Sequence, residues 1–435
     1  MNTRYETVAN HRITDVWSGQ ASSFDLYTRG QDQFVVYYAA DQSIAAAQRQ
    51  LDETEWTTTT VTESRNNVWD NHNSLALTID ADGYLHLAGD LHVDQLKYFR
   101  STEPLDVTTL ERVQPMVGDR EDRTTYPRFF DGPDGELIFE YRHGKSGAGD
   151  WLYNRYDLEN QHWERLIYEP LLVGGERSNP YLCGPTAGPD GYYHLAWGWR
   201  DHPAAQQQHD IYYARSKDLR HWETSQGDYV RRPIGEGIGE LVDPVPPWHG
   251  NLNGVNAIGF DTEERVILTY RKFDSEGNTQ IYNARAEEVA FEGLHPEKWT
   301  IYETSNWEYR DAFGGSGSLG TVIGAGSVEP EPDGRLSQTY THPVYGRGKW
   351  IVDEETLQPV EWRNPWYRYP QDLREVRSAH PAMAVQWNED SGKSPSDVNY
   401  VLRWEAEKTN ESHIGPDHPD PPTTPLELYE FKQRE

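Results

Sequence analysis

A short plan recurs along this 435-residue chain and restricts its fold more than any other feature of the sequence. Each copy is a turn, usually Asp-Gly, followed by a strand in which apolar and polar residues alternate and which ends in polar residues. Because Asp-Gly favours the tight turns that join antiparallel strands, each copy predicts a β-hairpin. The copies are DADGYLHLAGDLH (80–92), GPDGELIFEYRHG (132–144), GPDGYYHLAWGWR (188–200), the glycine-less DTEERVILTYRKF (261–273) and EPDGRLSQTYTHP (331–343).

A third strand, rich in aromatic and small residues, follows four of these copies, and a fourth segment with tryptophan usually comes after it. The third strands are QLKYFRS, WLYNRYD, DIYYARS and QIYNARA. The turn glycines Gly83, Gly135 and Gly191 stand 52 and 56 residues apart. Four strands in a unit of roughly this length are typical of a β-propeller blade.

We therefore predict an all-β fold, a seven-bladed β-propeller of four-stranded antiparallel blades, with six or eight blades as alternatives. Residues 1–435 are expected to form this single domain. Segment 23–56 fits a blade with an altered turn, and 380–387 and 400–407 supply parts of the last blade, which N-terminal strands would close. A β-sandwich is a weaker alternative, because it would not require one three-strand unit to recur with its polar residues at the same strand end.

The chain is strongly acidic, with a formal net charge of −31 from 71 acidic and 40 basic residues. Such a surface repels phosphates, so neither nucleic acid nor an anionic membrane is expected as a partner. No apolar run approaches the roughly 20 residues of a membrane helix. The N-terminal MNTRYETVANHR lacks the apolar core of a secretory signal, and cellular location stays open. The single cysteine, Cys183, excludes an intramolecular disulfide, and we expect a monomer.

Two histidines are predicted to face each other in the first complete hairpin. Pairing its strands outward from Asp80 opposite Tyr84 places His72 opposite His92. Residues paired across two strands hold their Cβ atoms about 4.5–5.5 Å apart, so both rings could act on one ligand.

The same strand end of the neighbouring blades is also polar. Since equivalent strand ends converge on one face of a propeller, these residues are candidates for a shared pocket. Their types are His, Tyr, Arg and Asn, on a very acidic protein, which favours an anionic ligand. The candidates are Asn71, Asn73, Tyr126, Tyr141, Arg142, His143, Arg155, Tyr181 and Arg200.

This residue set fits β-elimination better than glycoside hydrolysis. Hydrolases usually need two carboxylates at a defined separation, and no such pair is evident. Elimination from a uronic acid needs an arginine to neutralise the carboxylate, a base for the C5 proton and an acid for the leaving oxygen. His and Tyr suit the last two roles, and no cofactor is required.

Three runs carry a family resemblance over residues 69–222. WDNHNSLALTIDADGYLHLAGDLHVDQLKYFRS, EYRHGKSGAGDWLYNRYD and HLAWGWRDHPAAQQQHDIYYARSKD resemble segments of BNR-repeat proteins that include the propeller-type ulvan lyases. The resemblance implies cleavage of an anionic, sulphated rhamnose–uronate polysaccharide by β-elimination. It implies His72 and Tyr141 as the acid–base pair, in either order, His92 as a companion histidine and Arg155 as the carboxylate neutraliser.

Two other functions remain as alternatives. A sialidase-like glycoside hydrolase would need an arginine triad with a Tyr/Glu nucleophile pair, and no such arrangement is evident in the sequence. A non-catalytic carbohydrate-binding propeller would use the many surface tryptophans and tyrosines for stacking.

A structural metal ion, zinc or calcium, is a weaker expectation. Cys183, His194 and His209 fall on adjacent strands of one blade, and Cys with His is acceptable zinc chemistry. A buried free thiol with two hydrogen-bonded histidines is the favoured alternative.

Overall fold

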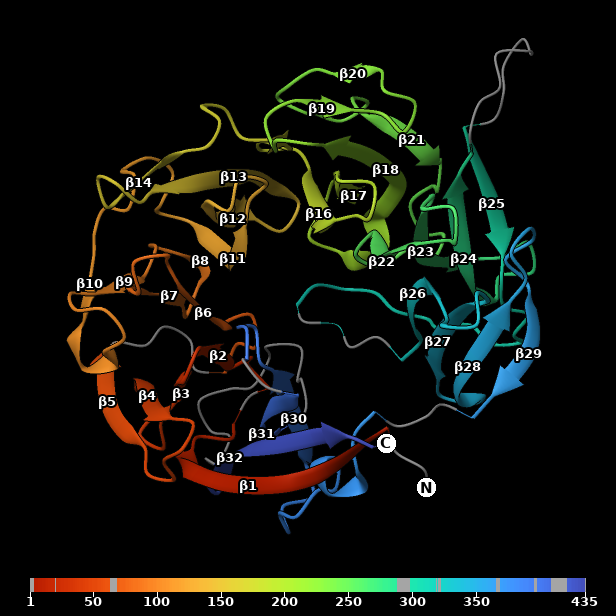
Figure 1. Cartoon of the computed structure of the whole chain (residues 1–435). Helices are drawn as coiled ribbons and strands as arrows, with labels where there is room; N and C mark the ends of the chain where they lie inside the picture. The colour runs from red at the N-terminus through yellow and green to blue at the C-terminus, as the bar shows by residue number, and fades with distance from the viewer. Residues whose placement is uncertain are drawn as a thin grey trace.

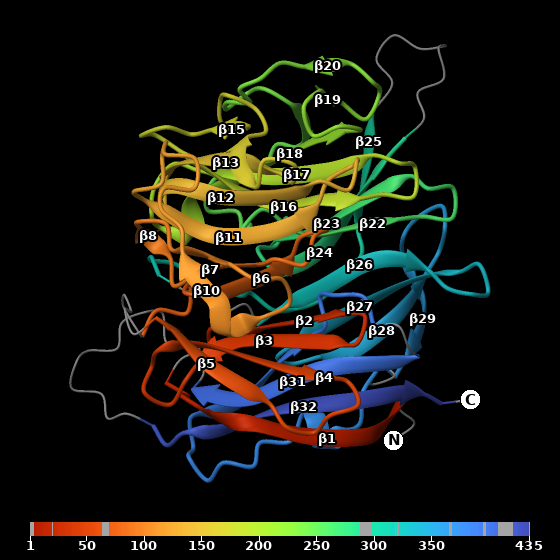
Figure 2. The same ribbon diagram turned by 60° about the vertical axis from the view of Figure 1, so that its left-hand side comes forward.

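Seven antiparallel sheets surround a common axis in the computed structural model of the chain (Figures 1 and 2). It describes residues 4–434 except 20, 63–68, 288–297, 318, 320, 321, 365–367, 395, 396 and 408–420. The described residues contain no α-helix and three short 3₁₀ helices, η1 (Val107–Thr109), η2 (Ala205–Gln207) and η3 (Gln371–Leu373). The predicted seven-bladed all-β propeller is confirmed.

Blades 1 to 4 follow one another along the chain, each beginning with its innermost strand. Blade 1 comprises β2 (Asp25–Arg29), β3 (Asp32–Tyr38), β4 (Ile44–Gln50) and β5 (Thr57–Thr62). Blade 2 comprises β6 (Leu75–Ile79), β7 (Leu85–Gly89), β9 (Tyr98–Ser101) and β10 (Leu110–Arg112). Blade 3 comprises β11 (Thr124–Asp131), β12 (Leu137–Lys145), β13 (Ala148–Asp157) and β14 (His162–Arg165), with β8 (His92–Asp94) and β15 (Leu172–Val173) added. Blade 4 comprises β16 (Asn179–Ala187), β17 (Tyr193–Arg200), β18 (Gln208–Ser216) and β19 (Trp222–Glu223), with β20 (Tyr229–Val230) and β21 (Glu240–Asp243) added.

The remaining blades close the ring. Blade 5 comprises β22 (Val255–Phe260), β23 (Val266–Phe273), β24 (Thr279–Ala286) and β25 (Trp299–Glu303). Blade 6 comprises β26 (Gly324–Pro330), β27 (Leu336–His342), β28 (Gly346–Val352) and β29 (Pro359–Arg363). Blade 7 comprises β30 (Met383–Glu389), β31 (Val398–Glu407) and β32 (Thr424–Gln433), with β1 (Tyr5–Val16) as its outer strand. The pairing of β1 with β32, from Tyr5 opposite Gln433 to Val16 opposite Thr424, confirms the predicted closure by an N-terminal strand.

The repeated turn has one geometry in all its copies. In blade 2 the Asp80 amide donates to the Tyr84 carbonyl at 3.0 Å, and Gly83 takes a φ of 97°, a conformation that glycine adopts without a Cβ clash. The glycine-less copy in blade 5 makes the same turn with Glu264 at φ 64°. There the Asp261 side chain accepts from the Arg265 amide at 2.9 Å, which supports the turn without glycine.

The core lies between the blades. The largest cluster joins blades 7, 1 and 2; in it Phe24 stacks on Trp404 with centroids 4.5 Å apart, and Leu77 of blade 2 belongs to the same cluster. Burying a side chain of this size stabilises the fold by about 1.5–3 kcal/mol. Because the apolar side chains pack between the blades, the polar residues at the strand ends are available to form a site.

Within the described residues, no helix has the length and apolar character needed to cross a membrane.

Candidate functional site

A pocket of about 350 Å³ opens where equivalent strand ends of several blades meet. Seven of the sequence-predicted site residues line it, namely Asn71, His72, His92, Tyr126, Arg142, Tyr181 and Arg200. The pocket is also lined by seven residues that were not predicted from the sequence, namely Ser74, Ser146, Ala205, Leu252, Asn253, Gly317 and Leu319. Gly317 and Leu319 come from the segment before β26, so blade 6 contributes to a pocket formed mainly by blades 2 to 5.

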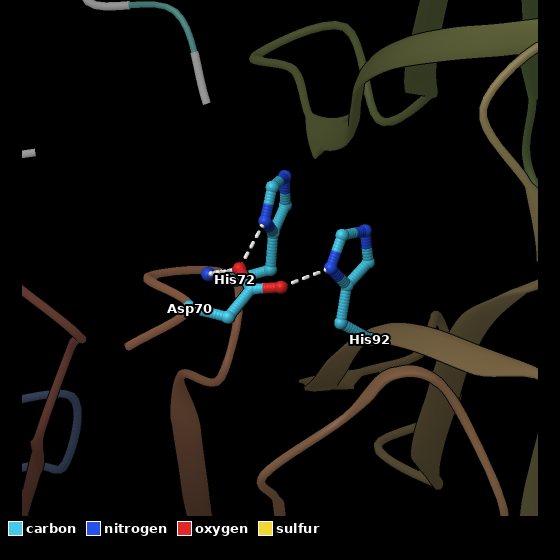
Figure 3. Close-up of side chains that lie close together, drawn as sticks. All are labelled: Asp70, His72 and His92. Carbon is cyan, nitrogen blue, oxygen red and sulfur yellow. Dashed lines mark hydrogen bonds and ion pairs between the residues drawn. The ribbon is translucent and has the colours of Figure 1, made fainter. Parts of the chain in front are cut away.

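His72 and His92 lie face to face, as the hairpin register predicts. The β6–β7 ladder ends at Leu75 opposite Gly89, and the two rings come together from segments outside it, a turn closed by the Asn73 amide and the Asp70 carbonyl before β6 and a bend at Asp90 (φ 56°) after β7. Their centroids are 3.9 Å apart and their planes differ by 21°. Figure 3 shows that the second nitrogen of each ring points away from Asp70.

Asp70 binds both histidines from below the pocket (Figure 3). One carboxylate oxygen lies 2.5 Å from His72 Nδ1, and the other bonds to His92 Nδ1. Burial alone would raise the pKa of Asp70, but the hydrogen bonds and positive charge of the two histidines outweigh it and hold the pKa well below its usual range. An ionised Asp70 requires Nδ1–H on each ring, which leaves Nε2 as the reactive nitrogen.

Sequence reasoning missed Asp70, although a local signal for it exists. Its carboxylate also accepts from the backbone amide of His72 at 3.0 Å, a short-range bond typical of Asp as the first residue of a turn. The motif Asp-Asn-His could therefore have indicated a carboxylate held close to the His72 ring.

His92 is placed beside Tyr126 by an inter-blade pairing. His92 begins β8, which pairs with β11 of blade 3 so that His92 opposes Thr125. The β11–β12 ladder is irregular between Thr125 and Arg128, and Tyr126 has a φ of 59°. This bulge directs Tyr126 into the pocket, where its ring centroid lies 5.8 Å from that of His72.

Two buried arginines supply positive charge to the pocket. Arg142 is 1% exposed and Arg200 is 7% exposed. Among the described residues, no carboxylate forms an ion pair with either guanidinium. Burial lowers the pKa of Arg142, and burial together with the nearby charge of Arg142 lowers the pKa of Arg200 to about 10.

Aromatic rings and a hydroxyl orient these arginines. The Arg142 guanidinium lies 4.8 Å from the Tyr126 centroid, and its Nη2 donates to Thr125 Oγ1 at 3.1 Å. The Arg200 guanidinium lies 3.8 Å from the Tyr181 centroid. Buried charges without counter-ions are costly, so a pocket that faces two of them is suited to an anion.

Tyr141 does not reach this pocket, which corrects its predicted position. It is 0% exposed and packs in the core cluster with Phe139 and Trp163. Its hydroxyl donates to the Arg120 carbonyl at 3.0 Å and accepts from Arg165 at 2.9 Å. Successive residues of a strand face opposite sides, so β12 sends Arg142 into the pocket and Tyr141 away from it.

Arg155 also lies elsewhere, because β13 runs back toward the turn end of the blade. It opposes Ile138 and forms an ion pair with Glu164. It lines a separate pocket with Asp80, Asp131 and other residues near the hairpin turns. The predicted role of carboxylate neutraliser therefore has no support in its position.

Asn73 and His143 flank the pocket residues without lining the pocket. Asn73 is buried, and its backbone carbonyl accepts from the Tyr38 hydroxyl at 2.5 Å. His143 Nε2 bonds to Asp122 at 2.9 Å. As with Tyr141, strand alternation separates His143 from Arg142.

The predicted metal ligands do not come together. Both ring nitrogens of His194 are hydrogen-bonded, to the Tyr213 hydroxyl at 2.7 Å and to Asp190 at 2.9 Å. A register irregularity between Cys183 and Thr186 opposes Cys183 to Ala196 and leaves it against a hydrophobic cluster, where burial raises its pKa to about 11. Two groups of described residues have geometry that could hold an ion, and neither contains Cys183 or His194. His209 belongs to one of them, with Asp201 and Glu236.

Curated relatives of this chain are ulvan lyases. The long isoform from Glaciecola sp. (strain KUL10) is 26% identical over 215 residues, covering 38% of this chain and 21% of the relative. The short isoform from Alteromonas sp. (strain LOR) is 26% identical over 168 residues, covering 34% of this chain and 31% of the relative. The chain thus spans about a fifth to a third of the length of these two relatives.

Solved structures share the fold over nearly the whole chain. The polysaccharide lyase Uly1 aligns with a TM-score of 0.60 at 14% identity, covering 98% of this chain and 99% of that one. A PL25 ulvan lyase bound to -[GlcA(1-4)Rha3S]- aligns with a TM-score of 0.58 at 12% identity, covering 93% and 94%. The sequence profile of BNR repeat-containing family members matches residues 32–307, well over half of the chain. The chain therefore belongs to the BNR repeat-containing family.

Proposed function

We propose that this protein is a polysaccharide lyase that cleaves a uronate-containing glycan by β-elimination. The observation that carries the proposal is the pair of buried arginines, Arg142 and Arg200, facing the same pocket as His72, His92 and Tyr126. The pocket combines a site for a carboxylate with groups that can take and give a proton.

Arg142 and Arg200 would neutralise the uronate carboxylate, which is the first requirement of the reaction. A uronate carboxylate next to C5 makes the C5 proton less acidic while it carries its full negative charge. Pairing with a guanidinium spreads the charge that develops when C5 is deprotonated, and in a dry pocket this stabilisation is larger than in water. Arg142 and Arg200 replace Arg155 in this role because both line the pocket.

His72 is our proposed base. Its Nδ1–H points to Asp70, so Nε2 carries the lone pair. Burial lowers the pKa of His72, against the opposing effect of Asp70, so the neutral ring predominates near neutral pH. His92, stacked on it and held by the same carboxylate, would bind the sugar beside the reacting carbon.

Tyr126 is our proposed acid. His72 Nε2 takes the C5 proton, the C5–H electrons form the C4–C5 double bond, and the C4–O bond breaks. The Tyr126 hydroxyl then gives its proton to the leaving oxygen. Proton return from His72 to Tyr126, directly or through water, restores both groups. The reaction requires no cofactor.

The proposed substrate is a sulphated rhamnose–uronate polysaccharide such as ulvan. The support is that the relatives are ulvan lyases and that one structural neighbour binds -[GlcA(1-4)Rha3S]-. Two buried guanidinium groups in one pocket suit a ligand with more than one anionic group.

Incubation with ulvan tests the proposal. β-Elimination creates an unsaturated uronate, so ultraviolet absorbance should rise together with new reducing ends. New reducing ends without absorbance would overturn elimination in favour of hydrolysis. Retention on ulvan with neither signal, over a panel of polyuronates, would leave a binding propeller instead.

A further inference from the structure

A second pocket, rich in aromatic rings, lies at the junction of blades 6 and 7. Its volume is about 210 Å³, and it shares no lining residue with the pocket described above. Its described lining consists of Thr339, Tyr340, Thr341, Arg347, Gly348, Arg368, Tyr369, Leu373, Arg374 and Trp387.

Rigid aromatic walls shape this junction pocket. Tyr340 stacks on Trp350 with centroids 4.2 Å apart, and its hydroxyl accepts from Trp362 Nε1 at 3.0 Å. Gly348 leaves room for this packing, since a Cβ there would lie 2.3 Å from the Tyr340 ring. On the opposite side, Trp387 is 43% exposed and meets Tyr369 edge-on. Trp387 is the exposed ring of this lining, and an exposed aromatic face can bind the C–H face of a sugar ring.

The charge of the junction pocket is opposite to that of the chain. Arg347, Arg368 and Arg374 are the charged residues of its described lining, and none of that lining is acidic. Arg368 is held in place by Glu389 at 2.8 Å and lies 5.3 Å from the Tyr369 centroid. Since the whole chain carries −31, a polyanion would be repelled over most of the surface and attracted locally here.

The blade 6 part of the junction pocket lies at the strand ends that form the first pocket in other blades, whereas its blade 7 part lies toward the opposite end, where the Tyr5 amide donates to the Arg368 carbonyl. Thr341 at the end of β27 opposes Gly324 at the start of β26, as Arg142 opposes Thr125 in blade 3. Figure 1 shows blades 6 and 7 as neighbours in the ring that also holds blades 2 to 4.

We infer that the junction pocket is an auxiliary binding site for one anionic sugar unit of a polysaccharide. The ring would pack on Trp387 and Tyr340, while Arg347, with Arg368 and Arg374, would pair with a sulphate or carboxylate group. The choice of ulvan as ligand rests on the proposed function, whereas the site itself rests on the aromatic and arginine lining.

Affinity electrophoresis in gels containing ulvan tests this inference without requiring turnover. Trp387→Ala and Arg347→Glu should each reduce the retardation of the native protein several-fold. Tyr168→Ala and Arg363→Ala are matched controls, since both side chains lie outside the junction pocket, and they should migrate like wild type. Equal retardation of wild type and both pocket variants would overturn the inference, as would equal retardation by neutral dextran.

Kinetics separate this inference from the proposed function. With ulvan polymer, both pocket variants should raise KM several-fold and leave kcat unchanged, and with a short oligosaccharide neither constant should change. If no lyase activity exists but the variants still lose retardation, the auxiliary site stands and the proposed function fails. If lyase activity is normal and retardation is unchanged, the auxiliary site fails and the proposed function stands. Thermal unfolding of each variant checks that it is folded.

Discussion

One carboxylate determines which nitrogen of each pocket histidine is free to react. Asp70 accepts from Nδ1 of both His72 and His92, so it acts on substrate only through them and is a positioning residue. The arrangement differs from a Ser-His-Asp triad in that two imidazoles share one carboxylate, and both keep Nε2 toward the pocket.

Replacing Asp70 with Asn should lower kcat by on the order of 10²–10⁴, because an amide no longer requires Nδ1–H on the histidines. The pH profile distinguishes this from simple disruption. Asp70 raises the pKa of His72 against the effect of burial, so its removal should move the acid limb of kcat to lower pH. An acid limb that stays in place while kcat falls would mean that Asp70 does not control His72.

Tyr126 lines the pocket, whereas Tyr141 lies in the core, so their substitution should have different effects. Tyr126→Phe should lower kcat by about 10²–10⁴, the contribution of a positioned acid. Tyr141→Phe should leave kcat near the wild-type value and cost about 1 kcal/mol of unfolding free energy, because it removes hydrogen bonds with Arg165 and the Arg120 carbonyl. Steady-state kinetics and urea denaturation measure the two effects. A reversal of the two phenotypes would return the acid role to Tyr141.

At the scale of elements, a short strand couples blades 2 and 3 across the pocket. β8 leaves blade 2 and pairs with β11 of blade 3. Thr125 joins three parts of the site, since its Oγ1 accepts from the Val93 amide at 2.9 Å and from Arg142 at 3.1 Å.

Thr125→Val keeps the shape of this side chain but removes both hydrogen bonds. We expect the unfolding free energy to fall by about 1–3 kcal/mol, because a buried and a partly buried donor lose their acceptor. We also expect kcat/KM to fall about tenfold, since His92 and Arg142 lose a shared anchor. Thr124→Val is the matched control, as the Thr124 hydroxyl makes only a 3.4 Å contact with the Glu121 carbonyl. Equal effects of the two substitutions would show that β8 does not position the site.

Element-level patterns explain what the sequence could and could not predict. The repeated turns predicted the blades and their register, and the register brought His72 and His92 together. The predicted positions of Tyr141 and Arg155 were wrong because they depend on which side of a strand a side chain faces and on which way the strand runs within its blade. Alternation along β12 turns Tyr141 away, and the return of β13 carries Arg155 to the opposite end. The bulge that places Tyr126 depends on the pairing of β11 with two partners, which no local pattern encodes.

Residues that line the pocket from distant blades were also beyond sequence reasoning. Leu252, Asn253 and Leu319 reach it through connections whose paths follow from the packing of the whole ring. They carry no catalytic residue type, so neither composition nor spacing could distinguish them from ordinary loop residues.

At the scale of the whole molecule, a half-buried carboxylate links three blades. Asp25 of blade 1 accepts from the Leu77 amide of blade 2 at 2.8 Å and from the Ser391 hydroxyl of the segment after β30 at 3.2 Å. Burial, partly opposed by these hydrogen bonds, raises the pKa of Asp25 from 3.8 to about 7.

The raised pKa of Asp25 predicts a pH-dependent stability. Between the unfolded value of 3.8 and about 7, the folded protein binds more protons at this group, so its contribution to stability is present at low pH and lost as pH rises. Asp25→Asn removes this dependence, and the unfolding free energy of the variant relative to wild type should increase with pH by at most roughly 1.4 kcal/mol per unit.

Asp41→Asn is the control of opposite sign. Hydrogen bonds from Ser43 lower the pKa of Asp41, so its contribution is present at high pH and lost as pH falls. Urea denaturation from about pH 2 to 8 measures both variants, because the Asp41 effect develops only below the unfolded value of 3.8. Parallel stability curves for Asp25→Asn and wild type would contradict the prediction.

The closure of blade 7 by β1 has a consequence for protein synthesis. Tyr5 and Gln433 are paired, so the ring cannot be completed until the ribosome has added the residues of β32. Until then the twelve residues of β1 have no strand partner, and the faces of blades 1 and 6 that flank blade 7 are uncovered. An unpaired strand edge is a template for association with other chains, so the nascent protein passes through a long interval in which chaperones would have to shield it.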